Sequence, residues 1–73
     1  MDLYSEKQKQ LVENIRKARI EAGLNQKELA NKLNKTQSFL SKIETGQVKV
    51  DAILLNEIAK ILDKDLNYFI NNH

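Results

Sequence analysis

The chain has 73 residues, of which 41% are hydrophobic, with no cysteine, no proline and a formal net charge of +2. This length suits a single domain with one core, and the absence of cysteine excludes disulfides and cysteine metal sites and favours an intracellular origin. The sequence has no apolar run of membrane-spanning length and no signal peptide with a cleavage site, so we expect a cytoplasmic protein and no membrane partner.

The charges are unevenly distributed along the chain. Residues 1–49 contain ten Lys and Arg against six Asp and Glu, a balance of +4, whereas residues 50–73 contain two Lys against four Asp and Glu, a balance of −2. A basic first part and an acidic last part would suit a protein that places one end on a polyanion. Chance scatter in a lysine-rich chain explains the pattern equally well, so charge alone does not identify a partner.

The composition predicts an all-α fold. The only glycines are Gly23 and Gly46, most other residues are good helix formers, and no stretch alternates apolar and polar residues as a strand would. We expect the first helix at about residues 5–22, because apolar side chains recur there at helical spacing on one face: Leu11, Ile15, Ala18 and Ala22.

A second helix is expected at about residues 26–33. Gly23 supplies a left-handed residue that closes the first helix. Asn25 is a good N-cap, and Glu28 three residues later completes a capping-box pattern. The inward positions of this helix are Leu29, Ala30 and Leu33.

Three further helices follow, each with its own start signal. Asn34 tolerates the positive φ of a turn, and Thr36 caps a third helix that ends at Gly46. Asp51 can cap a fourth helix, and Asp65 a short last one. These two helices carry Leu54, Leu55, Ile58, Ala59 and Leu62, and then Leu66, Phe69 and Ile70. No internal repeat or linker divides the chain, so residues 1–73 are expected to form one domain.

The most informative segment is residues 26–45, where a helix, a turn of three residues and a second helix follow one another. Short helices joined so tightly must cross at a steep angle, and a small side chain is needed where they touch. Ala30 stands at that point, and the space beneath can be filled by Leu29, Leu33, Leu40 and Ile43. This is the geometry of a helix-turn-helix, whose second helix enters the DNA major groove.

The sequence resembles the Cro/cI-type (XRE) family of helix-turn-helix regulators over about residues 15–70. Five segments match in register: Ile15-Arg16-x-x-Arg19, Gly23-Leu24-Asn25-Gln26, Leu29-Ala30-x-x-Leu33, Leu40-Ser41-Lys42-Ile43-Glu44-x-Gly46 and Ile58-Ala59-Lys60-x-Leu62. The resemblance implies a compact five-helix domain like that of phage lambda repressor, with the helix-turn-helix formed by helices 2 and 3. Three positions depart from the family pattern: Asn34 replaces a turn glycine, Lys35 a small apolar residue and Val50 a frequent proline.

The third helix, at about residues 36–45, is the expected recognition helix. A helical projection places Ser38, Lys42 and Thr45 on the side opposite Leu40, Ile43 and Glu44. Gln37, at the N-terminal tip, could pair with adenine, and Lys42 could donate to guanine or to phosphate. The resemblance implies base contacts from Gln37, Ser38 and Lys42. Exposed Gln and Ser on a short helix are otherwise usually only solvated.

Contacts with the DNA backbone are expected around this helix. The resemblance implies that Gln26, at the start of the second helix, bonds a phosphate, where free N–H groups and the positive end of the helix dipole favour an anion. The other candidates for backbone contact are Lys35, Ser41, Thr45 and Lys49. Lys35 could instead lie along the surface, and Phe39 could either touch a thymine methyl or pack against the preceding turn.

Glu44 falls on the buried side of the third helix, where an unpaired carboxylate would be costly. Arg19 lies one turn beyond Ile15 on the inward side of the first helix. We therefore expect Arg19 and Glu44 to form an ion pair that ties the two helices together, and the resemblance implies the same link.

Nothing in the sequence indicates an enzyme, a cofactor, a metal site or a small-molecule ligand. The single histidine is the terminal His73, the carboxylates have no paired spacing, and the two glycines are isolated helix stops.

The expected function is sequence-specific binding of double-stranded DNA by a transcriptional regulator acting as a homodimer on a palindromic operator. Phage repressors typify the family that the sequence resembles, and the sequence leaves both a repressor and an activator open. The expected dimer surface lies around Leu66, Tyr68, Phe69 and Ile70, although these residues could equally close the core, as we favour for Phe69. The alternative is a protein-interaction or antitoxin-like module that uses the helix-turn-helix as a scaffold.

Overall fold

The computed structural model describes residues 6–70, which form five helices and no strand. They are α1 (Glu6–Glu21), α2 (Gln26–Lys32), α3 (Gln37–Glu44), α4 (Ala52–Ile61) and α5 (Leu66–Ile70). The all-α prediction and the number of helices are confirmed. Residue 5, where the first helix was expected to start, and His73 lie outside the described residues.

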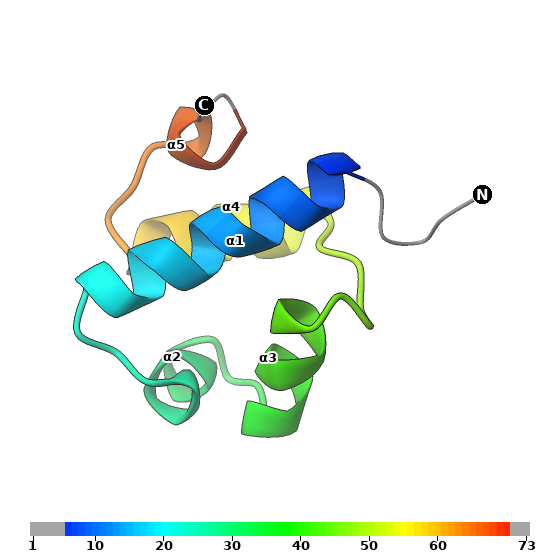
Figure 1. Cartoon of the computed structure of the whole chain (residues 1–73). Helices are drawn as coiled ribbons and strands as arrows, with labels where there is room; N and C mark the ends of the chain where they lie inside the picture. The colour runs from blue at the N-terminus through cyan, green and yellow to red at the C-terminus, as the bar shows by residue number, and fades with distance from the viewer. Residues whose placement is uncertain (1–5, 71–73) are drawn as a thin grey trace.

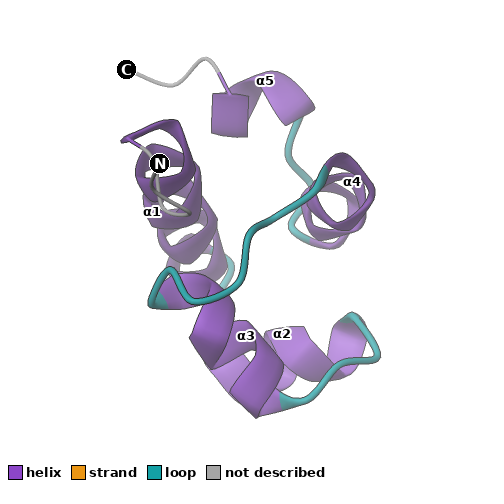
Figure 2. Cartoon of the chain, turned by 90° about the vertical axis from the view of Figure 1, so that its right-hand side faces the viewer, coloured by secondary structure: helices purple, strands orange, loops and turns teal. Residues whose placement is uncertain are grey.

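The helices are arranged around one core. Figures 1 and 2 show α1 and α4 across the middle of the molecule, with α5 at one end and the α2–α3 pair at the other. Each helix contributes apolar side chains to the core, and the largest that are fully enclosed come from all five helices: Phe69, Ile15, Leu29, Leu40, Ile43, Ile58 and Val12. The pair α2–α3 is therefore carried at one end of the domain, with its outer side exposed.

The starts expected from the sequence for the second to fifth helices are confirmed. In the capping box, Glu28 N donates to Asn25 Oδ1 and Asn25 N donates to Glu28 Oε1, both at 2.8 Å. The side chain of Thr36 accepts from Phe39 N at 3.1 Å, and that of Asp51 accepts from Leu54 N at 2.8 Å. Before the last helix, Asp65 Oδ1 accepts from Asn67 N at 3.0 Å. These bonds satisfy N–H groups that have no partner inside the helix.

Helices α1 to α4 all end in the same way, with a residue in the left-handed region. These residues are Gly23, Asn34, Gly46 and Asp63, with φ of 75°, 58°, 81° and 57°. At each end the following residue donates its N–H to a carbonyl five residues earlier, as in Lys35 N to Ala30 O and Lys64 N to Ala59 O, both 2.9 Å. This is the Schellman motif, which satisfies the last carbonyls of a helix.

The inward face of α1 differs from the one expected. Val12, Ile15 and Ala18 are at most 1% exposed, whereas Leu11 is half-buried and Ala22 is exposed. The expectation for Ala22 was wrong because α1 ends at Glu21 and the chain turns away at Gly23. The face is continued by Asn14, which is buried and donates Nδ2 to Phe69 O at 3.1 Å, joining α1 to α5.

The four helix ends allow a test of backbone strain. A Cβ added to Gly23 would have no atom within 4 Å, so Gly23→Ala should lower the free energy of unfolding by about 1 kcal/mol through its positive φ alone. Asp63→Gly should have the opposite effect and raise the free energy of unfolding by up to about 1 kcal/mol. Glycine adopts the positive φ of this position without strain, and the substitution also removes a negative charge from the C-terminal end of α4. Urea unfolding measures both, and equal losses in the two variants would contradict this account.

Candidate nucleic-acid interface

The α2–α3 pair positions the candidate site. The two helices are joined by a turn at residues 33–36, in which Asn34 has positive φ and Lys35 N bonds back to Ala30 O. Ala30 is 1% exposed, in the place where a small side chain was expected. Leu29, Leu40 and Ile43 are fully buried beneath the crossing. The inner side of α3 is thus buried in the core.

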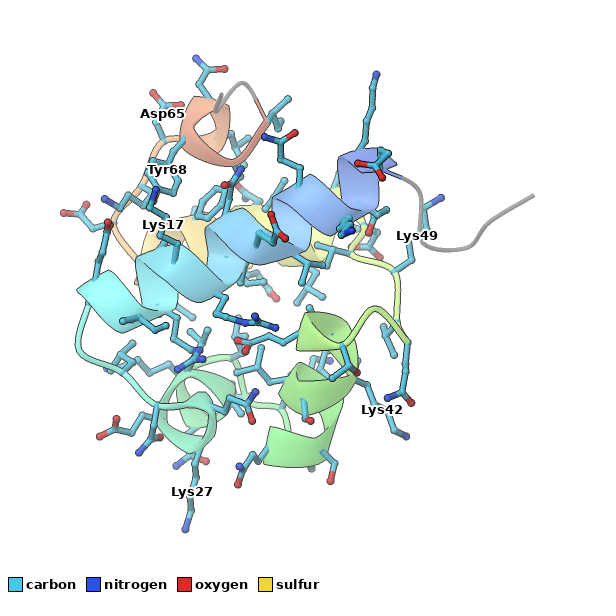
Figure 3. The ribbon with its side chains drawn as sticks, viewed as in Figure 1. Lys17, Lys27, Lys42, Lys49, Asp65 and Tyr68 are labelled. Atoms are coloured by element: carbon cyan, nitrogen blue, oxygen red, sulfur yellow. The ribbon has the colours of Figure 1, made fainter. Side chains whose placement is uncertain are left out.

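The outer side of α3 carries the predicted base-contacting residues. Gln37, Ser38, Lys42 and Thr45 are exposed, and Ser41 is half-buried. A hollow of about 390 Å³ lies on this side, lined by Gln37, Ser38, Ser41, Lys42 and Gln47. Figure 3 shows Lys42 projecting away from the core on this side and Lys27 projecting from α2, whereas Lys17 lies toward the α5 side. The structure therefore brings the three predicted base-contacting side chains onto one concave surface.

The two lysines predicted to contact the DNA backbone flank α3 in the chain, one before the helix and one after it. Lys35 Nζ is 5.3 Å from the centroid of the Phe39 ring, so this lysine lies along the surface, and the half-buried ring packs against the core. Lys49 is exposed in the loop between α3 and α4 (Figure 3). The Thr45 hydroxyl donates to Ser41 O at 3.0 Å, which closes the last turn of α3.

Glu44 is buried at the C-terminal end of α3 and paired as the sequence predicts. Arg19 Nε donates to Glu44 Oε2 at 2.8 Å, and Arg19 Nη2 donates to Oε1 at 3.1 Å. The side chains of Arg19 and Glu44 are only 12% and 2% exposed. The remaining terminal nitrogen of Arg19, Nη1, donates to Leu24 O at 2.9 Å, so every side of the guanidinium is engaged. Such two-point pairing adds geometric specificity to the charge attraction.

Two further side chains converge on Glu44. Gln26 Nε2 donates to Glu44 Oε1 at 3.0 Å, which holds the carboxamide of Gln26 between α2 and α3. Arg16 Nη2 donates to the backbone oxygen of Glu44 at 2.9 Å, and its Nε lies 3.6 Å from Oε1. A cation here is also stabilised by the negative end of the α3 dipole. Sequence reasoning missed this role of Arg16, although its spacing of three from Arg19 places both on one side of α1.

The loop after α3 is anchored at both ends. Gln47 N and Val48 N donate to Lys42 O at 2.8 and 3.2 Å. At the far end, Gln8 of α1 pairs with the backbone of Val50: Val50 N donates to Gln8 Oε1 at 3.2 Å, and Gln8 Nε2 donates to Val50 O at 3.4 Å. A proline at position 50 could not donate this N–H bond. Val50, which replaces the frequent proline of the family pattern, thus keeps an N–H group that bonds Gln8.

The segment that surrounds α3 is basic. Residues 26–50 contain five lysines against Glu28 and Glu44, a balance of +3, and the charge of Glu44 is already paired with Arg19. Residues 51–70 have two lysines against four carboxylates, a balance of −2. Among residues 6–70, no group of His, Asp and Glu is placed to hold a metal ion, and no helix is long and apolar enough to cross a membrane.

A family model described as helix-turn-helix matches residues 15–69, which includes α2, α3 and the loop that follows. Among curated proteins, none shows significant similarity to the chain.

The pairing at Glu44 predicts a large effect on stability. Glu44→Ala should cost about 3–5 kcal/mol, because it leaves the buried guanidinium of Arg19 without its carboxylate. Arg16→Ala should cost about 1 kcal/mol or less, since the Arg16 side chain is 48% exposed. The double variant Arg19→Leu, Glu44→Leu should recover much of the loss. Urea unfolding compares the three variants, and a Glu44→Ala loss no larger than that of Arg16→Ala would rule out the buried pair as a major source of stability.

Proposed function

Because the chain belongs to the Cro/cI-type family of helix-turn-helix DNA-binding domains, we propose that it is a transcriptional regulator that binds a specific double-stranded DNA site through α3. The observation that carries this proposal is the division of α3 into two sides. Its inner side is buried, and its outer side gathers Gln37, Ser38 and Lys42 around one hollow in the basic part of the chain. In this proposal residues 1–73 belong to one DNA-binding domain.

In the proposed complex, α3 lies in the major groove with its N-terminal residues toward the bases. Gln37 offers a donor and an acceptor that match the N6 and N7 atoms of adenine. Lys42 donates to guanine, and Ser38 bonds either base type. The hydroxyl and amide groups on this surface can replace the hydrogen bonds that the base edges lose when water leaves. A base pair with a different pattern of donors and acceptors does not regain these bonds, and this difference discriminates between sequences.

Backbone contacts hold the domain in register on the duplex. Gln26 uses one amide hydrogen for Glu44 and keeps the second for a phosphate, so the carboxylate that pairs with Arg19 also orients this contact. Lys35, in the turn before α3, and Lys49, in the loop after it, approach the backbone from opposite ends of α3. Ser41 adds a contact along α3, and Thr45 adds one by turning its hydroxyl hydrogen from Ser41 O to a phosphate.

We further propose that two copies bind a palindromic operator as a homodimer that represses transcription. One helix of 8 residues reads only a few base pairs, and a two-fold pair doubles the length of sequence that is read. Phe69 is 1% exposed and belongs to the core, as favoured from the sequence. Leu66 and Ile70, 39% and 62% exposed on α5, remain as the apolar candidates for the contact between subunits.

Selection of bound sites from random DNA tests the proposed function. We expect enrichment of a palindrome whose half-sites are about 10 base pairs apart, bound roughly 10³-fold or more tightly than random DNA, with affinity falling steeply as salt rises. If no fragment is enriched over random DNA, the chain instead acts as a protein-interaction module.

Three single variants separate base contacts from backbone contacts. Gln37→Ala should relax the preference at one position of each half-site and cost about 1–3 kcal/mol on the selected site. Lys49→Ala should weaken all sequences evenly and reduce the slope of log affinity against log salt by about 1. Lys17→Ala is the matched control, because Lys17 lies toward the α5 side (Figure 3) and should change neither quantity. Equal losses for Lys17→Ala and Lys49→Ala in titrations at several salt concentrations would contradict the assigned DNA-binding side.

A further inference from the structure

The hollow on the outer side of α3 has one wall that does not come from a helix. Four of its lining residues, Gln37, Ser38, Ser41 and Lys42, lie on α3, and the fifth, Gln47, lies in the loop beyond it. We propose that Gln47 is a specificity-determining residue of the DNA interface and reads the edge of an adenine in the major groove. This inference rests on the proposed function and adds a base contact to it.

The backbone at Gln47 is held against α3. Its N–H donates to Lys42 O at 2.8 Å, and Val48 N donates to the same oxygen at 3.2 Å. Val50 is 5% exposed and paired through both of its backbone groups with Gln8. Because the loop is anchored on both sides of Gln47, its side chain keeps a defined position relative to the other residues of the hollow.

The carboxamide of Gln47 is also oriented. Its Nε2 donates to Thr45 Oγ1 at 2.9 Å, and the Thr45 hydroxyl donates onward to Ser41 O at 3.0 Å. One hydrogen of Nε2 is used in this chain, which leaves the second hydrogen and Oε1 available within the described residues. These two groups are the donor and acceptor that pair with N7 and N6 of adenine. A side chain already fixed in the free protein loses less entropy when it binds.

The position of Gln47 predicts which base pair it reads. Gln37 and Gln47 stand at opposite ends of α3, whose 8 residues span about 12 Å. With α3 lying along the major groove, at about 3.4 Å per base pair, this distance corresponds to three or four base pairs. The two glutamines therefore read positions separated by that interval within one half-site, with Ser38 and Lys42 between them.

Site selection from random DNA with the full chain and its variants tests the inference. Gln47→Ala should retain the wild-type consensus except at one adenine in each half-site, three or four base pairs from the position relaxed by Gln37→Ala, and should bind the selected site about tenfold more weakly. Gln47→Lys should move the preference at that position from adenine to guanine. Asn56→Ala, which removes an exposed amide on α4, is the matched control and should leave the consensus unchanged. Thermal melts of all variants confirm equal folding.

The outcomes separate this inference from the proposed function. A wild-type protein that enriches no site overturns both. A wild-type consensus that Gln47→Ala retains at every position overturns the inference alone. An even loss of affinity over all sequences in Gln47→Ala, with no change of consensus in Gln47→Lys, also overturns it, because it identifies a phosphate contact.

Discussion

The arrangement of the helix-turn-helix depends on the carboxylate of Glu44. This one group, buried at the end of α3, accepts hydrogen bonds from Arg19 on α1 and from Gln26 on α2, and Arg16 bonds the backbone oxygen of the same residue. A buried charge is tolerated only where its oxygens are fully paired, so the three helices must meet in this arrangement to satisfy it. The core supplies apolar contact area, which is not directional, whereas these bonds define the orientation of α3.

That arrangement links stability to the outer surface of the domain. Because α3 is oriented from within, its outer residues are not needed for folding and can be polar. Gln37, Ser38 and Lys42 occupy that side, and the anchored loop adds Gln47 to the same hollow. Gln26 belongs to both parts, since the bond from its amide to Glu44 also positions it at the start of α2. In this account the protein recognises DNA with a surface that is already formed before it binds.

The sequence predicts those parts of the structure that are governed by local interactions. The caps at Asn25, Thr36 and Asp51 and the turns at Gly23 and Asn34 involve residues a few positions apart, so their side-chain chemistry is sufficient to identify them. The pair of Arg19 with Glu44 was also predictable, because a carboxylate on an apolar helix face demands a partner. The DNA contacts of individual side chains stay predictions.

Other features depend on tertiary placement and have no local signal. Gln8 meets the backbone of Val50 across 42 residues, and Asn14 meets Phe69 O across 55, and only the packed fold brings these groups together. At Asp63, the left-handed turn was missed because aspartate is less typical of that conformation than glycine or asparagine.

The central claim is that the α2–α3 side of the domain, oriented through Glu44, is the surface that binds DNA. Titration of the ¹⁵N-labelled protein with a selected duplex, followed by NMR, tests it most directly. The account predicts that the largest shift changes occur at residues 26, 37–42 and 45–49, while the resonance of Arg19 Nε–H persists and α5 changes little. Changes centred on α4 or α5, with the outer side of α3 unaffected, would contradict it.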